Sequence, residues 1–180
     1  MGHSWGGFST MNISALHPEI SHLIVMSGFI SVEKMINSFF SGLLKPYRKC
    51  IMKIENESNP DFVNSDGVQV LKKTEAKVLL IYSDNDTLCK KEVHFDELKK
   101  ELSGKSNIEF MLEKGKGHNP NFTENAVKYK DDFFAILTKK SKKKQLETKE
   151  EKEKFKKSFD WHKMTEQDEK VWGKIFAFLD

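Results

Sequence analysis

The chain has 180 residues, of which 38% are hydrophobic and 32% charged, and its formal net charge is +3. This length suits one domain with a buried core, and the small net charge gives no reason to expect a nucleic-acid partner. Two widely spaced cysteines indicate neither a disulfide framework nor a zinc site, and with no signal peptide or bilayer-spanning run we expect a cytoplasmic protein without a membrane partner.

The first residues of the chain contain a Gly-x-Ser-x-Gly pattern, formed by Gly2, Ser4 and Gly6. This spacing is typical of a nucleophile elbow, a strained turn between a strand and a helix from which the serine hydroxyl projects. Side chains at Gly2 and Gly6 are expected to prevent the sharp turn and the close packing of the helix. Residues 5–17 predict that helix, which ends before Pro18 because a residue preceding proline is pushed out of the helical conformation.

Residues 22–27 form a short apolar run, which is typical of a strand buried on both faces of a parallel sheet. From about 31 to 74 the pattern loosens. Four large apolar side chains in this interval lie on a predicted helix: Phe39, Phe40, Leu43 and Leu44. Such a helix belongs more often to a core than to a substrate pocket, and both interpretations stay open.

The remaining elements alternate between strands and helices. The clearest strand covers residues 76–82 and is followed by a polar loop at 83–86. A charged helix is predicted over about 90–103, a further strand over 107–113, and another helix from near Thr123. This alternation predicts an α/β fold with a mostly parallel sheet.

Residues 139–157 are lysine and glutamate with hardly an apolar side chain, which predicts a solvated helix or a mobile insertion. A membrane-surface role would need an apolar face, and only Leu146 and Phe155 could contribute to one. The chain closes with an amphipathic helix over residues 169–179, which is expected to dock on the sheet.

Candidate acids and a candidate base follow the serine in the chain. The loop after the clearest strand contains Asp84 and Asp86, and His118 lies in a glycine-flanked loop after the last predicted strand. Most loop aspartates only cap a turn or a helix, and most single histidines are structural or solvated. Five other histidines lack a comparable context: His3, His17, His22, His94 and His162.

Three stretches together, residues 2–7, 80–86 and 115–118, resemble the alpha/beta hydrolase superfamily. The resemblance covers nearly the whole chain but only the C-terminal half of that fold. It implies a partial alpha/beta-hydrolase fold, with a mostly parallel sheet flanked by helices and the N-terminal strands missing. It also implies one domain over residues 1–180 with a possible lid insertion at about 31–74.

The resemblance further implies a catalytic triad. Ser4 is the implied nucleophile and His118 the implied base, because the family uses the order Ser, Asp, His. The family's acid follows a small residue and two variable positions, which favours Asp86 and leaves Asp84 as the alternative. The backbone amide of Trp5 is the implied oxyanion donor, and neither a metal nor an organic cofactor is required.

These features predict a serine hydrolase that acts through an acyl-enzyme on small-molecule carboxylic esters or acyl-amides. The alternative is a catalytically impaired fragment, or a non-catalytic interaction module whose lysine-rich segment contacts acidic partners. Missing strands are expected to leave Ser4 at a fraying terminus and to expose a sheet edge that invites self-association. Loss of one oxyanion donor would lower the rate roughly 10²- to 10³-fold, so we expect a longer natural protein or a poorly active remnant.

Overall fold

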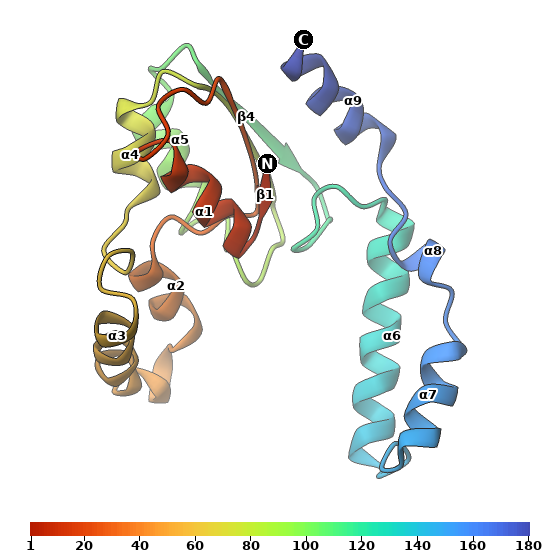
Figure 1. Ribbon diagram of the computed structural model, residues 1–180. Helices are drawn as coiled ribbons and strands as arrows, with labels where there is room; N and C mark the ends of the chain where they lie inside the picture. Colours follow the sequence, from red (N-terminus) through yellow and green to blue (C-terminus); the bar gives the residue numbers. More distant parts are fainter. The chain divides into compact units, whose positions relative to one another are not determined.

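The computed structural model describes residues 1–180 and divides into two compact units (Figure 1). The first unit comprises Met1–Pro120 and Lys174–Asp180, and the second comprises Asn121–Gly173. None of the helices combines the length and the apolar character that crossing a lipid bilayer requires.

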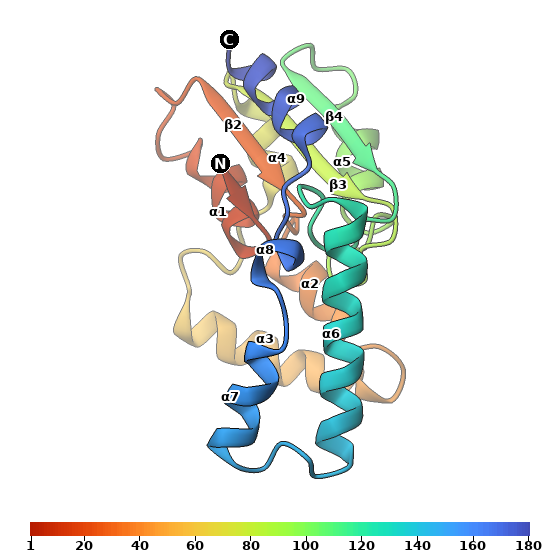
Figure 2. The ribbon, with the colours of Figure 1, turned by 90° about the vertical axis from the view of Figure 1, so that its right-hand side faces the viewer.

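The first unit is built on a parallel sheet, whose longer strands are seen in Figure 2. The strands lie side by side in chain order: β1 (Gly2–His3), β2 (His22–Met26), β3 (Lys77–Ser83) and β4 (Ile108–Glu113). Val25 of β2 lies opposite Leu80 of β3, and Leu80 lies opposite Phe110 of β4. The α/β class and the parallel sheet are therefore confirmed, and the three apolar runs predicted as strands agree with β2, β3 and β4 to within one residue at each end.

Three helices of the first unit pack on one another and on the sheet: α1 (Trp5–Ile13), α4 (Gly67–Lys73) and α5 (Phe95–Leu102). Met11, Leu71 and Leu98 from these helices share one buried cluster with Val25 and Leu80 of the sheet. Complete burial of such side chains stabilises the fold by about 1.5–3 kcal/mol each. The helices are therefore held in place mainly by the apolar face that they share with the strands.

The C-terminal helix α9 (Glu169–Leu179) contacts the sheet through its residues from Lys174 onward. The ring of Phe178 lies 5.6 Å from the ring of His22 at the start of β2. The Lys174 ammonium lies 2.5 Å from the Glu109 carboxylate on β4. The predicted docking of this helix on the sheet is confirmed by these two contacts.

Helix α1 ends at Ile13, four residues earlier than the sequence predicts. Beyond it the chain forms turns, in which the backbone N–H of Leu16 and that of His17 both donate to the Ile13 carbonyl. The Ser14 hydroxyl also donates to the Met11 carbonyl at 3.2 Å. Serine side chains compete with the helical pattern in this way, so the helix does not need Pro18 to end it.

The interval after β2 contains three α-helices and one 3-10 turn, whereas the sequence predicts that Phe39, Phe40, Leu43 and Leu44 share one helix. They are α2 (Val32–Phe39), the 3-10 turn η1 (Gly42–Leu44), α3 (Tyr47–Ser58) and α4. Helix α2 ends at Phe39, because Phe40 leaves the helical conformation with a φ of −97° and a ψ of 73°, and Leu43 and Leu44 lie in the separate turn η1. Leu43 is 96% exposed, whereas Phe40 packs against a buried cluster around Phe29. The interpretation of all four apolar side chains as core is therefore wrong.

The turn before α5 holds a fully buried histidine, His94. Its Nδ1 accepts a hydrogen bond from the Ile30 backbone N–H at 3.2 Å, and its Nε2 has no hydrogen-bond partner. Burial and the positive charge of Lys34 lower the pKa of His94 to about 4, although the Asp86 carboxylate opposes this shift. His94 is therefore neutral in the folded protein at neutral pH.

We expect His94 to make the protein acid-sensitive. In the unfolded chain its pKa returns to about 6.5, so the unfolded state binds a proton that the folded state does not. The free energy of unfolding should therefore fall by on the order of 2–3 kcal/mol as the pH decreases from about 6.5 to about 4. Urea unfolding at several pH values in this range measures the free energy of unfolding against pH. The slope of that plot should be smaller for His94→Gln than for the wild-type protein. His17→Gln, at an exposed histidine, should keep the wild-type slope, and equal slopes in all three proteins would contradict the assignment.

The second unit is a group of helices around an aromatic cluster. It contains α6 (Glu124–Lys142), α7 (Lys149–Lys157), α8 (Trp161–Met164) and the start of α9. Helix α7 begins with a capping box, in which the Thr148 hydroxyl accepts from the Glu151 N–H and the Glu151 carboxylate accepts from the Thr148 N–H. Leu146 and Phe155 are both buried against Phe133 of α6.

The packing of Leu146 and Phe155 against Phe133 shows how residues 139–157, predicted as a solvated helix or a mobile insertion, are arranged. The lysine-rich segment completes α6, turns, and returns as α7, with its lysines exposed and its two apolar side chains directed inward. Two buried side chains are enough to hold the turn and helix against α6. The predicted solvated helix is therefore present at the end of α6 and in α7, whereas the burial of Leu146 and Phe155 was not predicted.

Candidate active site

Ser4 lies in the turn between β1 and α1, where its φ of 56° is unusual for a residue other than glycine. Its backbone N–H donates to the Met26 carbonyl at 3.0 Å, and its carbonyl accepts from the Phe8 N–H at 3.1 Å. These two hydrogen bonds hold the strained conformation. The predicted strained turn between a strand and a helix is therefore confirmed, and strain of this kind is concentrated at functional sites.

The glycines around Ser4 differ in how much space their surroundings leave for a side chain. A Cβ at Gly2 would lie 2.1 Å from the Gly6 carbonyl oxygen, so the expected steric restriction at Gly2 is confirmed. A Cβ at Gly6 would meet no atom within 4 Å, so the same expectation for Gly6 is wrong. The close packing of the helix instead occurs at Gly7, where a Cβ would lie 2.7 Å from the Gly28 Cα.

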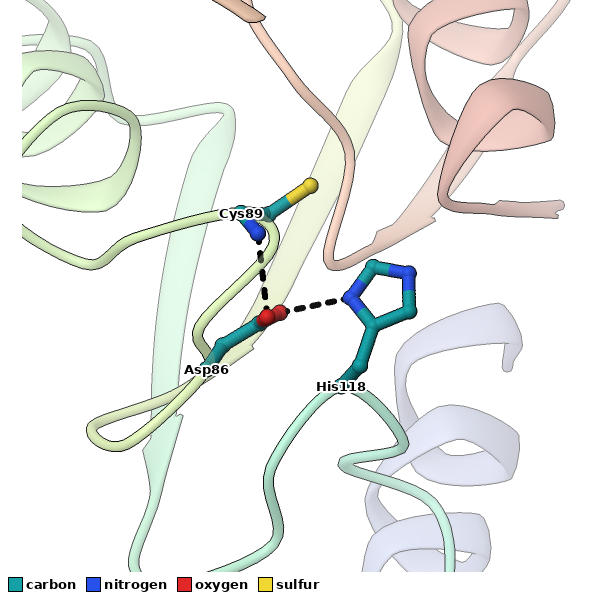
Figure 3. A group of neighbouring side chains, drawn as sticks. All are labelled: Asp86, Cys89 and His118. Atoms are coloured by element: carbon teal, nitrogen blue, oxygen red, sulfur yellow. Dashed lines mark hydrogen bonds and ion pairs between the residues drawn. The ribbon is translucent and has the colours of Figure 1, made fainter. Parts of the chain in front are cut away.

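Asp86 lies in the loop after β3 with its carboxylate buried. One oxygen accepts from the backbone N–H groups of Leu88 at 2.8 Å and Cys89 at 2.9 Å, and the other lies 2.8 Å from His118 Nδ1 (Figure 3). Burial by itself would raise the pKa of Asp86. The hydrogen bond and charge of His118, together with the two N–H groups, outweigh burial and lower the pKa below its usual value.

The other polar residues of this loop bind the backbone of the loop that carries His118. Asp84 Oδ1 accepts from the Gly115 N–H at 2.8 Å. Asn85 Oδ1 accepts from the Gly117 N–H at 2.7 Å and from the Ser83 hydroxyl at 2.9 Å. In this structure Asp84 therefore holds a loop, whereas Asp86 contacts the histidine ring.

His118 presents its Nδ1 to Asp86 and its Nε2 away from it (Figure 3). The side chain of His3 lies next to it, with the ring centroids 4.7 Å apart and His3 Nε2 2.6 Å from the His118 carbonyl oxygen. The Ser4 hydroxyl makes no hydrogen bond to the His118 ring. The structure thus joins Asp86 to His118 directly and brings β1 to the same place through His3, the residue before Ser4.

Trp5, the implied oxyanion donor, is the first residue of α1. The N–H groups of the first helical turn have no partner within the helix, and they carry the positive end of the helix dipole. The position of Trp5 in this turn is compatible with the implied role, which stays a prediction.

Two neighbours of this site were not predicted from the sequence: His3 and Cys89. His3 occupies a variable position of the glycine–serine pattern, so nothing in that pattern indicates its contact with His118. Cys89 follows Asp86 by three residues, which in a turn places its thiol beside the carboxylate and the imidazole. The spacing alone has no such meaning, because the third group comes from a different loop.

The parallel sheet, its strand order and the strand–Ser4–helix turn agree with the α/β fold that the resemblance implied. No protein-family model matches the chain, and no curated protein matches it.

Several solved structures are similar to parts of the chain. One is a monoacylglycerol lipase from Paleococcus ferrophilus, with 16% identity and a TM-score of 0.48 over 65% of this chain and 58% of that chain. A carboxylesterase structure from Nitrososphaera gargenis has 17% identity and a TM-score of 0.46 over 76% and 61%. A putative dipeptidyl aminopeptidase IV from Bacteroides ovatus has 17% identity and a TM-score of 0.48 over 77% and 18%. The chain therefore spans less than two thirds of the length of each of these hydrolases.

Proposed function

We propose that the protein is a serine hydrolase that cleaves small-molecule carboxylic esters or acyl-amides through an acyl-enzyme. The observation that supports this most is the hydrogen bond between the buried Asp86 carboxylate and His118 Nδ1, on the side of the sheet where Ser4 follows β1. In parallel sheets the carboxyl ends of all strands meet at one edge, which is where ligands bind. Ser4 follows β1, Asp86 follows β3 and His118 follows β4 at that edge.

The proposed chemistry begins with the tautomer of His118. Because Asp86 accepts the proton on Nδ1, Nε2 is the basic nitrogen. It removes the proton of the Ser4 hydroxyl as the serine oxygen attacks the acyl carbonyl. His118 then gives this proton to the leaving group, and a water molecule activated by the same nitrogen releases the acid.

The contact between Ser4 and His118 is expected to form when substrate binds. Catalytic hydrogen bonds are often long or poorly aligned without substrate and shorten in the complex. The developing oxyanion would accept from the Trp5 N–H at the start of α1, where the helix dipole also favours negative charge.

An apolar groove supports an ester with an apolar acyl group. The groove has a volume of about 660 Å³ and begins at Trp5, the residue after the proposed nucleophile. Phe8 of α1, Leu16 in the turns after that helix and Phe62 are among the residues that line it. Its volume lies within the usual range for small-molecule sites, which are mostly apolar with a few polar groups.

A fluorophosphonate probe tests the proposal, because it reacts only with an activated serine. We expect the wild-type protein to be labelled at one residue and to hydrolyse p-nitrophenyl esters. Ser4→Ala should lose both the label and the hydrolysis, whereas Ser103→Ala, at an exposed serine directly after α5, should keep both. A folded wild-type protein that takes no label would refute the proposal and support the alternative of a non-catalytic interaction module.

A further inference from the structure

The thiol of Cys89 lies beside the Asp86–His118 pair without a role in the proposed reaction. One ligand atom from each of Asp86, Cys89 and His118 lies within 4.8 Å of those of the other two. Figure 3 shows the Cys89 sulfur, the Asp86 carboxylate and the His118 ring around a common space. Cys89 is brought there by its own backbone N–H, which donates to the Asp86 carboxylate at 2.9 Å.

This set of donor atoms is one that zinc prefers. Zn²⁺ binds cysteine sulfur, histidine nitrogen and carboxylate oxygen, with bond lengths of about 2.0–2.3 Å in a tetrahedral arrangement. Tetrahedral ligands at those lengths are about 3.3–3.7 Å apart. The three atoms therefore need to move by roughly 1 Å to share one ion.

The charge balance also favours a divalent cation. Asp86 and Cys89 are 4% and 3% exposed, and an unpaired charge in such a place would be costly. One Zn²⁺ with one carboxylate, one thiolate and one neutral imidazole forms a cluster without net charge. A dication without the thiolate would leave one buried positive charge uncompensated, and a monovalent cation would balance the carboxylate alone without involving Cys89.

We propose that Asp86, Cys89 and His118 form an inhibitory binding site for Zn²⁺ or a similar thiophilic divalent ion. The ion binds His118 at Nδ1, displacing its hydrogen bond to Asp86, and the ring proton moves from Nδ1 to Nε2. The thiol proton of Cys89 is released to solvent, and a water molecule takes the fourth position on the metal. With Nε2 protonated, His118 cannot accept the proton of Ser4. The inhibitory part of this inference rests on the proposed function, whereas the binding part does not.

The alternative role for Cys89, as a nucleophile in place of Ser4, does not fit its surroundings. Burial and the Asp86 carboxylate raise the pKa of the Cys89 thiol to about 12. Only the thiolate attacks a carbonyl efficiently, so the metal-free thiol is inert at neutral pH. The metal supplies the positive charge that a thiolate at this place requires.

Binding is tested on the full chain with Co²⁺ as a spectroscopic probe and Zn²⁺ titrated by calorimetry. We expect one Zn²⁺ per chain and a near-ultraviolet cobalt–thiolate absorption band with Co²⁺. Cys89→Ser should lose the band and at least tenfold in Zn²⁺ affinity. Cys50→Ser, which removes the exposed free cysteine, should keep both. A wild-type protein without the band, or equal Zn²⁺ affinity in wild type and Cys89→Ser, would overturn the site.

Inhibition is tested separately on ester hydrolysis and on fluorophosphonate labelling of Ser4. We expect Zn²⁺ to suppress both in the wild-type protein, and EDTA to restore them. Cys89→Ser should hydrolyse the ester at the wild-type rate without metal. The Zn²⁺ concentration that halves this rate should be at least tenfold higher for Cys89→Ser than for the wild-type protein. If the protein binds Zn²⁺ through Cys89 but never labels Ser4, the proposed function fails and the metal site stands. If the protein is active and Zn²⁺ bound at Cys89 leaves its rate unchanged, the inhibitory role is refuted.

Discussion

Replacing Asp86 by asparagine is expected to lower kcat for ester hydrolysis by about 10⁴-fold. The buried carboxylate accepts the Nδ1 proton of His118, and hydrogen bonds hold its own pKa below the usual value, so it is ionised throughout the working pH range. An asparagine side chain can offer its N–H₂ to Nδ1 and thereby place the ring proton on Nε2. In that tautomer His118 cannot act as the base, although the geometry is preserved. Steady-state kinetics with a p-nitrophenyl ester measure the loss.

Asp84 provides the matched control in the same loop. Its Oδ1 accepts from the Gly115 N–H, and the carbonyl oxygen of an asparagine can accept the same hydrogen bond. Asp84→Asn should therefore change kcat by less than about tenfold, because the loop that carries His118 stays in place. The assignment of the acid would be reversed if Asp84→Asn caused the large loss and Asp86→Asn the small one.

Replacing Gly7 by alanine is expected to reduce the free energy of unfolding by more than about 3 kcal/mol, at the upper end of what overpacking costs. The new Cβ would lie 2.7 Å from the Gly28 Cα and 3.2 Å from the Met26 carbonyl oxygen. These are backbone atoms next to a buried strand, so they cannot give way as the end of a flexible side chain can. Helix α1 would have to move away from β2, and Ser4 would move with it.

Gly6 is the control for this substitution, because it precedes Gly7 in the same helix. Its Cβ would point into open space, and alanine is favoured over glycine in a helix by up to about 1 kcal/mol. Gly6→Ala should therefore leave the protein equally or slightly more stable. Urea unfolding of the two variants measures the difference. Equal destabilisation by both substitutions would show that the contact with Gly28 is not the cause.

The parallel sheet could be predicted because its central strands are buried on both faces. The residues of β2 and β3 are nearly all apolar, and such runs between glycine-rich or polar loops have few other interpretations. The helices were less well predicted, since their ends depend on local hydrogen bonds. The Ser14 hydroxyl forms such a hydrogen bond directly after α1, and Phe40 leaves the helical conformation directly after α2, although the side chains that follow could have continued each helix.

The burial of Leu146 and Phe155 in the lysine-rich segment, residues 139–157, was not predicted for a different reason. The composition of this segment is dominated by the charged residues that cover its exposed surface. Two apolar residues among them change the composition very little. Leu146 and Phe155 are too few to produce a clear period, yet Phe133 of α6 provides a place where both can be buried. Which side chains meet there depends on the tertiary turn between α6 and α7.

For the candidate site, the sequence indicates which residues are suitable but not how they meet. The order of Ser4, Asp86 and His118 suggested their roles, and the structure places two of them in direct contact. The contacts of His3 and Cys89 with this pair arise because His3 of β1 and the loops after β3 and β4 meet at one edge of the sheet. No spacing along the chain encodes that meeting.

The side chains of Ser83, Asp84 and Asn85 hold the loop that carries His118, and this determines which positions of that loop can be substituted. In the next loop they accept hydrogen bonds from the main-chain N–H groups of residues 115–117. These hydrogen bonds help to orient His118, and they do not depend on which side chains stand at 115–117. Gly115 and Gly117 are constrained by their φ values of 69° and 57°, but Lys114 is exposed and takes no part in these hydrogen bonds. A substitution at Lys114 is therefore expected to change the surface of this loop without redirecting the imidazole of His118.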